Sequence, residues 1–284
     1  MKPILITPFL VLALLFTVAA QDSGLPSIQR PELTTAQREA MEELNLATQS
    51  YREGKFAEAQ LHSEKALALD PSNKTAPLFI ARTIHAQYKP GDQSEANVAK
   101  AREAISAYQT ILVQNSHNEE AYKAIASLYA ALKDEELLRE WIFRRAIDPT
   151  FPDEERAEAY TVLASKAWDC SYKITETSSQ KFTTIDHNNR VEVHYNKPSD
   201  PAEFKKAQRC ATEGLEMVEV ATTLDPNNEA AWSYKTNLLL ELAKLSEMDH
   251  DLQLKIEYTN QSNAAQRTTA EIWKRKASNP VSKP

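Results

Sequence analysis

The chemistry-bearing side chains of this sequence are not spaced as catalytic motifs. The four glycines lie far apart, so no glycine-rich loop could hold a phosphate. The sequence also lacks the His-Glu-x-x-His, Gly-x-Ser-x-Gly and Cys-x-x-Cys patterns of metalloproteases, serine hydrolases and thiol redox proteins. Acidic runs such as Asp134–Glu136 come at expected helix starts, where carboxylates complement the helix dipole. We therefore expect a protein that is not an enzyme, with no catalytic residues and no cofactor.

One polar segment carries two histidines and has strand character. His187 and His194 have no third partner at a metal-ligand spacing, so we expect no metal site. Phe182–Ile185 and Val191–Tyr195 are rich in β-branched and aromatic residues and flank an Asn-Asn turn, which predicts a β-hairpin. A mobile loop is the alternative interpretation. A metal-dependent enzyme built around the 170–199 segment is the rival functional class.

The rest of the chain has the pattern of helices that stop and restart at turns. Two helical segments end in the same way, at Asp70-Pro71 and at Asp225-Pro226, and another alanine- and aromatic-rich run follows each turn at once. Internal similarity of this kind is typical of stacked helical hairpins.

The stretch 40–73 resembles a tetratricopeptide repeat (TPR), a unit of about 34 residues that forms two antiparallel helices. Small side chains are needed where the two helices touch, and Ala47 is expected to face Ala59 there. The matching pairs of later units are Ala81 with Ala104 and Ala164 with Gly214. The residues that carry the resemblance in the first unit are Leu46, Ala47, Gly54, Phe56, Ala59, Ala66 and Pro71.

The resemblance implies an all-α fold, an α-solenoid of about five TPR-like antiparallel helix pairs over 35–277. The fourth unit contains the possible β-hairpin as an insertion at 170–200, and a polar helix at about 251–276 would cap the array. A Tyr-x-Pro-Gly-Asp turn at 88–92 makes the chain similar to a group of exported bacterial TPR proteins, a similarity that implies no particular activity.

The N-terminus has the features of a targeting segment. Lys2 precedes an apolar stretch from Ile4 to Val18, and small residues follow at 18–20, which predicts a signal peptide over 1–20. A membrane anchor is the alternative, but the stretch is shorter than a bilayer span requires. We expect a flexible leader at 21–34, a disordered tail at 278–284, and an exported, periplasmic or extracellular protein without stable membrane insertion.

The two cysteines bracket the insertion. Counted through the TPR-like unit, Cys170 and Cys210 fall at the corner where the end of one helix faces the start of the next. Export and this placement favour a disulfide between them. Two free buried thiols are the alternative, since a thiol packs like a small apolar side chain.

Since the sequence contains no catalytic motif, we expect the function to be binding. The TPR resemblance implies that ligands bind on the concave face, which the first helix of each pair lines. The predicted ligand-binding groove contains Tyr51, Arg52, Arg82, His85, Lys123 and Trp168, and other groove positions are Glu158, Asn237 and Glu241. The alternative for the aromatic residues is packing between units. A net charge of −7 argues against nucleic acid. We expect a monomer that binds a protein or peptide; a structural subunit of a cell-envelope assembly is the alternative.

Overall fold

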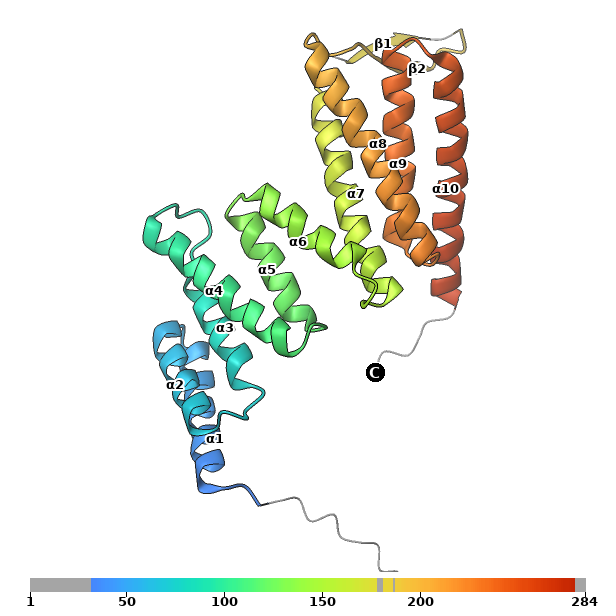
Figure 1. The fold of residues 1–284 in the computed structure, drawn as a ribbon. Helices are drawn as coiled ribbons and strands as arrows, with labels where there is room; N and C mark the ends of the chain where they lie inside the picture. Colours follow the sequence, from blue (N-terminus) through green and yellow to red (C-terminus); the bar gives the residue numbers. More distant parts are fainter. Residues whose placement is uncertain (1–31, 178–180, 186, 279–284) are drawn as a thin grey trace, which may run out of the picture.

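The computed structural model describes residues 32–177, 181–185 and 187–278. The predicted signal peptide, most of the predicted leader and nearly all of the predicted tail lie outside the described residues. Within the described part, the helices form five consecutive antiparallel pairs joined by short turns, as the repeat pattern predicts (Figure 1). The pairs are α1 (Thr35–Arg52) with α2 (Phe56–Leu69), α3 (Ala76–Gln87) with α4 (Glu95–Gln114), α5 (Glu119–Ala131) with α6 (Glu135–Ile147), α7 (Asp153–Thr175) with α8 (Pro201–Leu224), and α9 (Glu229–Met248) with α10 (Leu252–Ser278).

Small residues lie where the helices of each pair approach. Ala47, Ala59, Ala81 and Ala104 are fully buried, in agreement with the sequence pattern. The predicted partner of Gly214 was Ala164, but the structure places Gly214 one turn further along α7. A Cβ on Gly214 would meet Ala167 of α7 and Leu238 of α9. Gly214 therefore allows close packing of α8 against two helices at once.

The turns between helix pairs share one hydrogen-bond pattern. The carboxylate of Asp70 accepts from the backbone N–H two residues later, and Asp225 does the same. Asn228 then accepts from the backbone N–H of Ala231 and caps the next helix. The turn before α5 repeats this arrangement with Asn115 in place of the aspartate and Ser116 in place of the proline, so the Asp-Pro pattern did not predict it.

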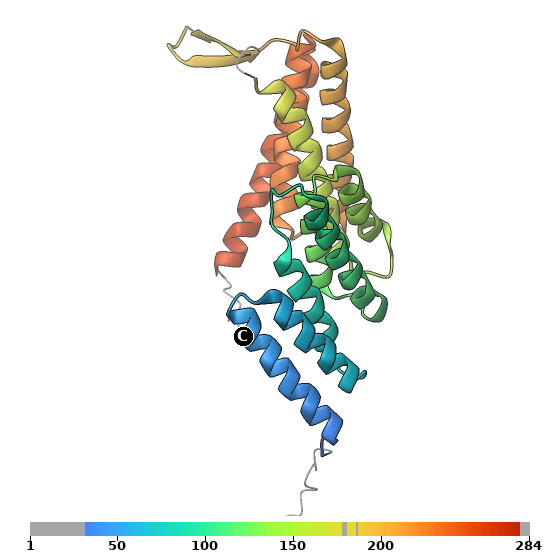
Figure 2. The same cartoon turned by 90° about the vertical axis from the view of Figure 1, so that its left-hand side faces the viewer.

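The four C-terminal helices run side by side as a bundle (Figures 1 and 2). Helix α7 packs against both α8 and α9, and α9 packs against α10. Their shared core contains Val218 and Leu238, both fully buried. Helix α10 is largely polar on its outer side, as expected for a terminal cap. Within the described part of the chain, no helix combines the length and the apolar character needed to cross a bilayer.

The insertion forms the predicted β-hairpin at one end of this bundle. Strand β1 (Lys181–Ile185) pairs antiparallel with β2 (Val191–Tyr195), with Ile185 opposite Val191. The predicted start of the insertion at residue 170 is wrong, because α7 continues to Thr175. The polar side chains of this last part of α7 bind α9, as described below, and this tertiary contact stabilises the additional helical turn.

Candidate functional site

Three of the four predicted groove residues of the first two units, Tyr51, Arg82 and His85, contact other residues of the protein. The ring of Tyr51 packs against Phe79 of the next unit, with centroids 5.6 Å apart. Arg82 forms a two-pronged ion pair with Glu120 across the boundary between the second and third units. His85 is half buried beside Tyr108, and burial lowers the pKa of His85. Arg52 is exposed at the end of α1.

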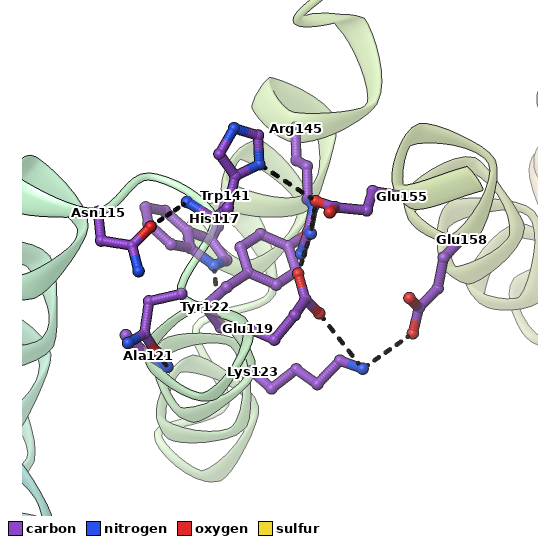
Figure 3. Close-up of polar contacts among 11 residues, drawn as sticks. Asn115, His117, Glu119, Ala121, Tyr122, Lys123, Trp141, Arg145, Glu155 and Glu158 are labelled. Atoms are coloured by element: carbon purple, nitrogen blue, oxygen red, sulfur yellow. Dashed lines mark hydrogen bonds and ion pairs between the residues drawn. The ribbon is translucent and has the colours of Figure 1, made fainter. Parts of the chain in front are cut away.

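Lys123 belongs to a charged network between the third and fourth units (Figure 3). Its Nζ lies 3.4 Å from a carboxylate oxygen of Glu119 and 3.3 Å from one of Glu158. The buried guanidinium of Arg145 on α6 binds both Glu119 and Glu155, so it links α5 to α7. Burial disfavours the charged form of Arg145, but these two carboxylates outweigh it and raise its pKa.

Aromatic rings enclose this arginine. Its guanidinium carbon lies 4.1 Å from the ring centre of Tyr122 and 5.2 Å from that of Phe151. The indole of Trp141 stacks on Tyr122 and donates to the Tyr122 backbone carbonyl (Figure 3). The arrangement joins three helices, so we interpret it as a structural junction between units.

Trp168, the last predicted groove residue, lies in a different environment, a cleft of about 430 Å³ near the hairpin end of the C-terminal bundle. Two other predicted groove positions, Asn237 and Glu241, line the same cleft. The structure therefore does not bring the six predicted residues into one site, and Trp168 is the one of the six that lines this cleft. The lining residues are Trp168, Tyr172, Glu176, Val193, Tyr195, Asn237, Leu240, Glu241, Ala243, Lys244, Glu247, Lys255 and Thr259.

One wall of the cleft is aromatic and apolar. The ring centres of Trp168 and Tyr172 are 4.7 Å apart, one helical turn from each other on α7. Tyr234 of α9 supports Trp168 from the side, at 6.2 Å. Leu240 remains 48% exposed at the rim, and Val193 of β2 completes the apolar surface. Such a surface suits an apolar or aromatic side chain of a ligand.

The cleft also contains a buried ion pair, between Glu241 and Lys244. Glu241 is only 2% exposed, and one of its oxygens accepts from Ser171 and from Thr175. Its other oxygen lies 2.8 Å from the Nζ of Lys244, which also lies 2.7 Å from a carboxylate oxygen of Glu176. Every charge in this group therefore has a partner, and the group connects α7 to α9.

A second charged group attaches the hairpin to the bundle. The imidazole of His194 lies 2.8 Å from a carboxylate oxygen of Glu247, and Lys255 of α10 lies 2.8 Å from the other oxygen. Burial raises the pKa of Glu247, but hydrogen bonds from Lys255 and His194 outweigh it, so the pKa lies below its ordinary value. Glu176 shows the same balance, with burial opposed by Lys181 and Lys244, and its pKa is also lowered.

The predicted disulfide is present between α7 and α8. The Cα atoms of Cys170 and Cys210 lie 6.1 Å apart and their sulfurs are bonded. Both residues lie inside helices, since α7 ends at Thr175 and α8 begins at Pro201. The bond therefore connects the two helices below the hairpin and not at their tips.

The histidines of the insertion do not come together. His194 contacts Glu247 and the hydroxyl of Thr184, whereas His187 contacts the neighbouring Asn188. Among the described residues, no group of three or more histidine, cysteine, aspartate or glutamate side chains is placed to hold a metal ion.

Sequence analysis missed several residues of the cleft. Tyr172 and Tyr195 belong to segments that were assigned to the insertion, and Lys244 and Glu247 lie one and two turns beyond the last predicted groove position of α9. The spacing of Glu241, Lys244 and Glu247, at steps of three residues, places them along one side of the helix and could have indicated a shared polar face.

Comparison with known proteins finds no family model and no curated protein sequence that matches the chain. Among solved structures, the crystal structure of MamA protein aligns with 87% of this chain and 98% of its own, at 13% identity and a TM-score of 0.40. YrrB, a TPR protein with an unusual peptide-binding site, aligns with 78% of this chain and 92% of its own, at 15% identity and a TM-score of 0.35. A tetratricopeptide repeat protein from Parabacteroides merdae aligns with 84% of this chain and 98% of its own, at 12% identity and a TM-score of 0.35. At these scores, the fold assignment rests on the five helix pairs themselves, which give the chain a TPR-like α-solenoid architecture.

Proposed function

We propose that the chain is an exported scaffold that binds a protein or peptide on the concave face of its solenoid, in the cleft at the α7–α9 end. The proposal rests on the residues that line this cleft. Trp168, Asn237 and Glu241 come from groove positions of the first helices, and Val193 and Tyr195 come from the insertion, yet all five line one cleft. The groove and the insertion therefore form a single candidate surface.

The charge balance of the cleft indicates the class of ligand. Glu176, Glu241 and Glu247 are paired within the protein with Lys244 and Lys255. Because these charges are already compensated, affinity would come from the aromatic and apolar wall and from hydrogen bonds to a peptide backbone. A neutral segment with aromatic or aliphatic side chains fits this surface. A polyanion such as nucleic acid does not, since the chain carries a net charge of −7.

Export is part of the proposal. An apolar stretch followed by small residues at 18–20 supports cleavage of a signal peptide. The bond between Cys170 and Cys210 fits an oxidising compartment, the periplasm or the extracellular space. Mass spectrometry of the protein from its native source should give a mature N-terminus at Gln21. A native protein that retains Met1 would contradict export with cleavage.

The binding site can be tested with peptides selected from a random displayed library on the full mature protein. Fluorescence anisotropy would then give the affinity for the wild type and for two cleft variants, Leu240→Gln and Trp168→Phe. Leu240→Gln keeps good helix propensity at a side chain that is 48% exposed, so it should weaken binding on the order of tenfold without loss of fold. Phe143→Ala removes a half-exposed aromatic ring from α6, outside the cleft, and should leave the affinity unchanged.

A different pattern would contradict the proposed location. The sequence pattern alone predicts that ligand binding depends on Arg52, Arg82, Lys123 and Trp168. If Arg82→Ala weakened binding and Leu240→Gln did not, the ligand would lie in the groove of the first units. Equal affinity of the wild type and all variants would place it on another surface.

A further inference from the structure

The β-hairpin presents an exposed apolar face. Its register places Ile185 opposite Val191 and Thr183 opposite Val193, so the side chains of these two cross-strand pairs share one face of the ribbon. Ile185 is 69% exposed, Val191 67% and Val193 47%. Adjacent exposed β-branched side chains of this kind mark an interaction surface.

Contacts at the base of the ribbon hold it against the bundle without a ligand. Lys181 at the start of β1 pairs with Glu176, and His194 of β2 contacts Glu247. The ring of Tyr195 lies 4.9 Å from the Nζ of Lys244. A ligand that binds a surface already ordered in this way does not have to bear the entropy cost of ordering it.

The edges of the ribbon are available for strand pairing. The sheet has only two strands in the described part of the chain, so each strand has one edge with no strand neighbour. Neither strand contains a proline, so one of the usual protections of an edge strand is missing; Lys181 lies at the base of the apolar face, and Glu192 lies on the opposite face. At its base this face continues into the cleft, because Val193 and Tyr195 line it.

We infer that the hairpin is a docking edge to which an extended segment of a partner protein adds as a further strand. The segment would add beside β2, with alternate apolar side chains next to Val191 and Val193 on the same face, and it would continue into the cleft beside Trp168. The inference rests on the proposed function and adds the binding mode and the ligand chemistry: an extended, uncharged segment with an apolar residue at every second position. Pairing with the hairpin of a second copy fits less well, because it would cover the ribbon and leave the cleft unfilled.

The test uses the full mature protein and three labelled peptides. The probe is a short peptide in which threonine and valine alternate between terminal lysines. The second peptide has the same composition with its valines contiguous, and the third is the alternating peptide with every second amide N-methylated. The protein variants are the double variant Val191→Thr/Val193→Thr, which keeps β-branched residues in the strand, and the control Glu192→Gln on the opposite face.

Strand addition predicts that the alternating peptide binds on the order of tenfold more tightly than the other two, since only it offers both alternation and a complete set of amides. The double variant should weaken its binding about tenfold, and the control should bind as the wild type does. Absence of binding, or equal binding of all three peptides, would overturn the inference.

Further outcomes separate this inference from the proposed function. If N-methylation had no effect while Leu240→Gln weakened binding, strand addition would be refuted and the cleft would remain the binding site. If the double variant weakened binding and Leu240→Gln did not, the docking edge would be supported and the cleft location refuted. A dimer in sedimentation velocity that the double variant converts to monomer would overturn the inference in favour of a second copy.

Discussion

Breaking the bond between Cys170 and Cys210 should destabilise the C-terminal bundle by a predictable amount. The bond closes a loop of 40 residues that contains the whole hairpin. In the chain-entropy treatment, a loop of this length is worth about 4 kcal/mol at 25 °C. For a chain of this size, that loss corresponds to a fall in melting temperature of roughly 8–16 °C. The assay is thermal unfolding followed by circular dichroism, with and without a phosphine reductant.

The chain contains no cysteine besides these two, which provides a matched control. The double variant Cys170→Ala/Cys210→Ala should melt at the temperature of the reduced wild type, and the reductant should not change its melting temperature. In the reduced wild type and in the double variant, limited proteolysis should cut the 176–200 segment faster than in the oxidised wild type. A shift below about 3 °C would refute the reasoning, because it would mean that the packing of α7 on α8 restricts this loop without help from the bond.

Three other predictions concern charge and packing. Glu241→Gln should lower the free energy of unfolding by about 3 kcal/mol in urea titrations, because it leaves a buried lysine partly unpaired. Glu158→Gln, which removes an exposed ion pair, should lower it by less than about 1 kcal/mol. Equal losses for the two variants would contradict the conclusion that the Glu241 pair is buried and the Glu158 pair is exposed. The lowered pKa values of Glu176 and Glu247 mean that the folded state holds these carboxylates ionised more strongly than the unfolded state does, so their contribution is present above about pH 4.5 and is lost as the pH falls further. The protection factors of the hairpin amides, which are the intrinsic exchange rates divided by the observed rates, should therefore fall below that pH, and constant protection factors would contradict this. Gly214→Ala would place a Cβ 2.7 Å from a methyl group of Leu238 on α9. This overpacking should outweigh the gain in helix propensity, so the free energy of unfolding should fall by about 1 kcal/mol in the same urea titrations. A stabilised variant would show that the leucine moves aside freely.

Local rules account for what the sequence predicts correctly. The helix pairs follow from small residues at fixed spacing, such as Ala47 and Ala59, which admit close contact between helices. The hairpin follows from the β-branched residues on either side of the Asn-Asn turn. The disulfide follows from the position of Cys170 and Cys210 within the repeat, which determines where the two helices meet.

Long-range charge pairing accounts for what the sequence did not predict. Arg82 occupies a groove position, but Glu120 of the next unit neutralises it, and a repeat pattern does not show which charges meet across unit boundaries. The contact between Lys244 and Glu176 joins residues 68 positions apart and depends on the continuation of α7 to Thr175. Because the same contact helps to form the cleft, the cleft could not be located before the structure was known.

Hydrogen-exchange mass spectrometry of the mature protein with a selected peptide tests the central claim most directly. If ligands bind in the cleft, the bound peptide should slow exchange in the last turns of α7, in strand β2 and in the second half of α9, the segments that line the cleft around Trp168 and Leu240. Exchange in α1–α4 should not change. Slower exchange confined to α1–α4, around Arg82, would contradict the account and place the binding site in the groove of the first two units.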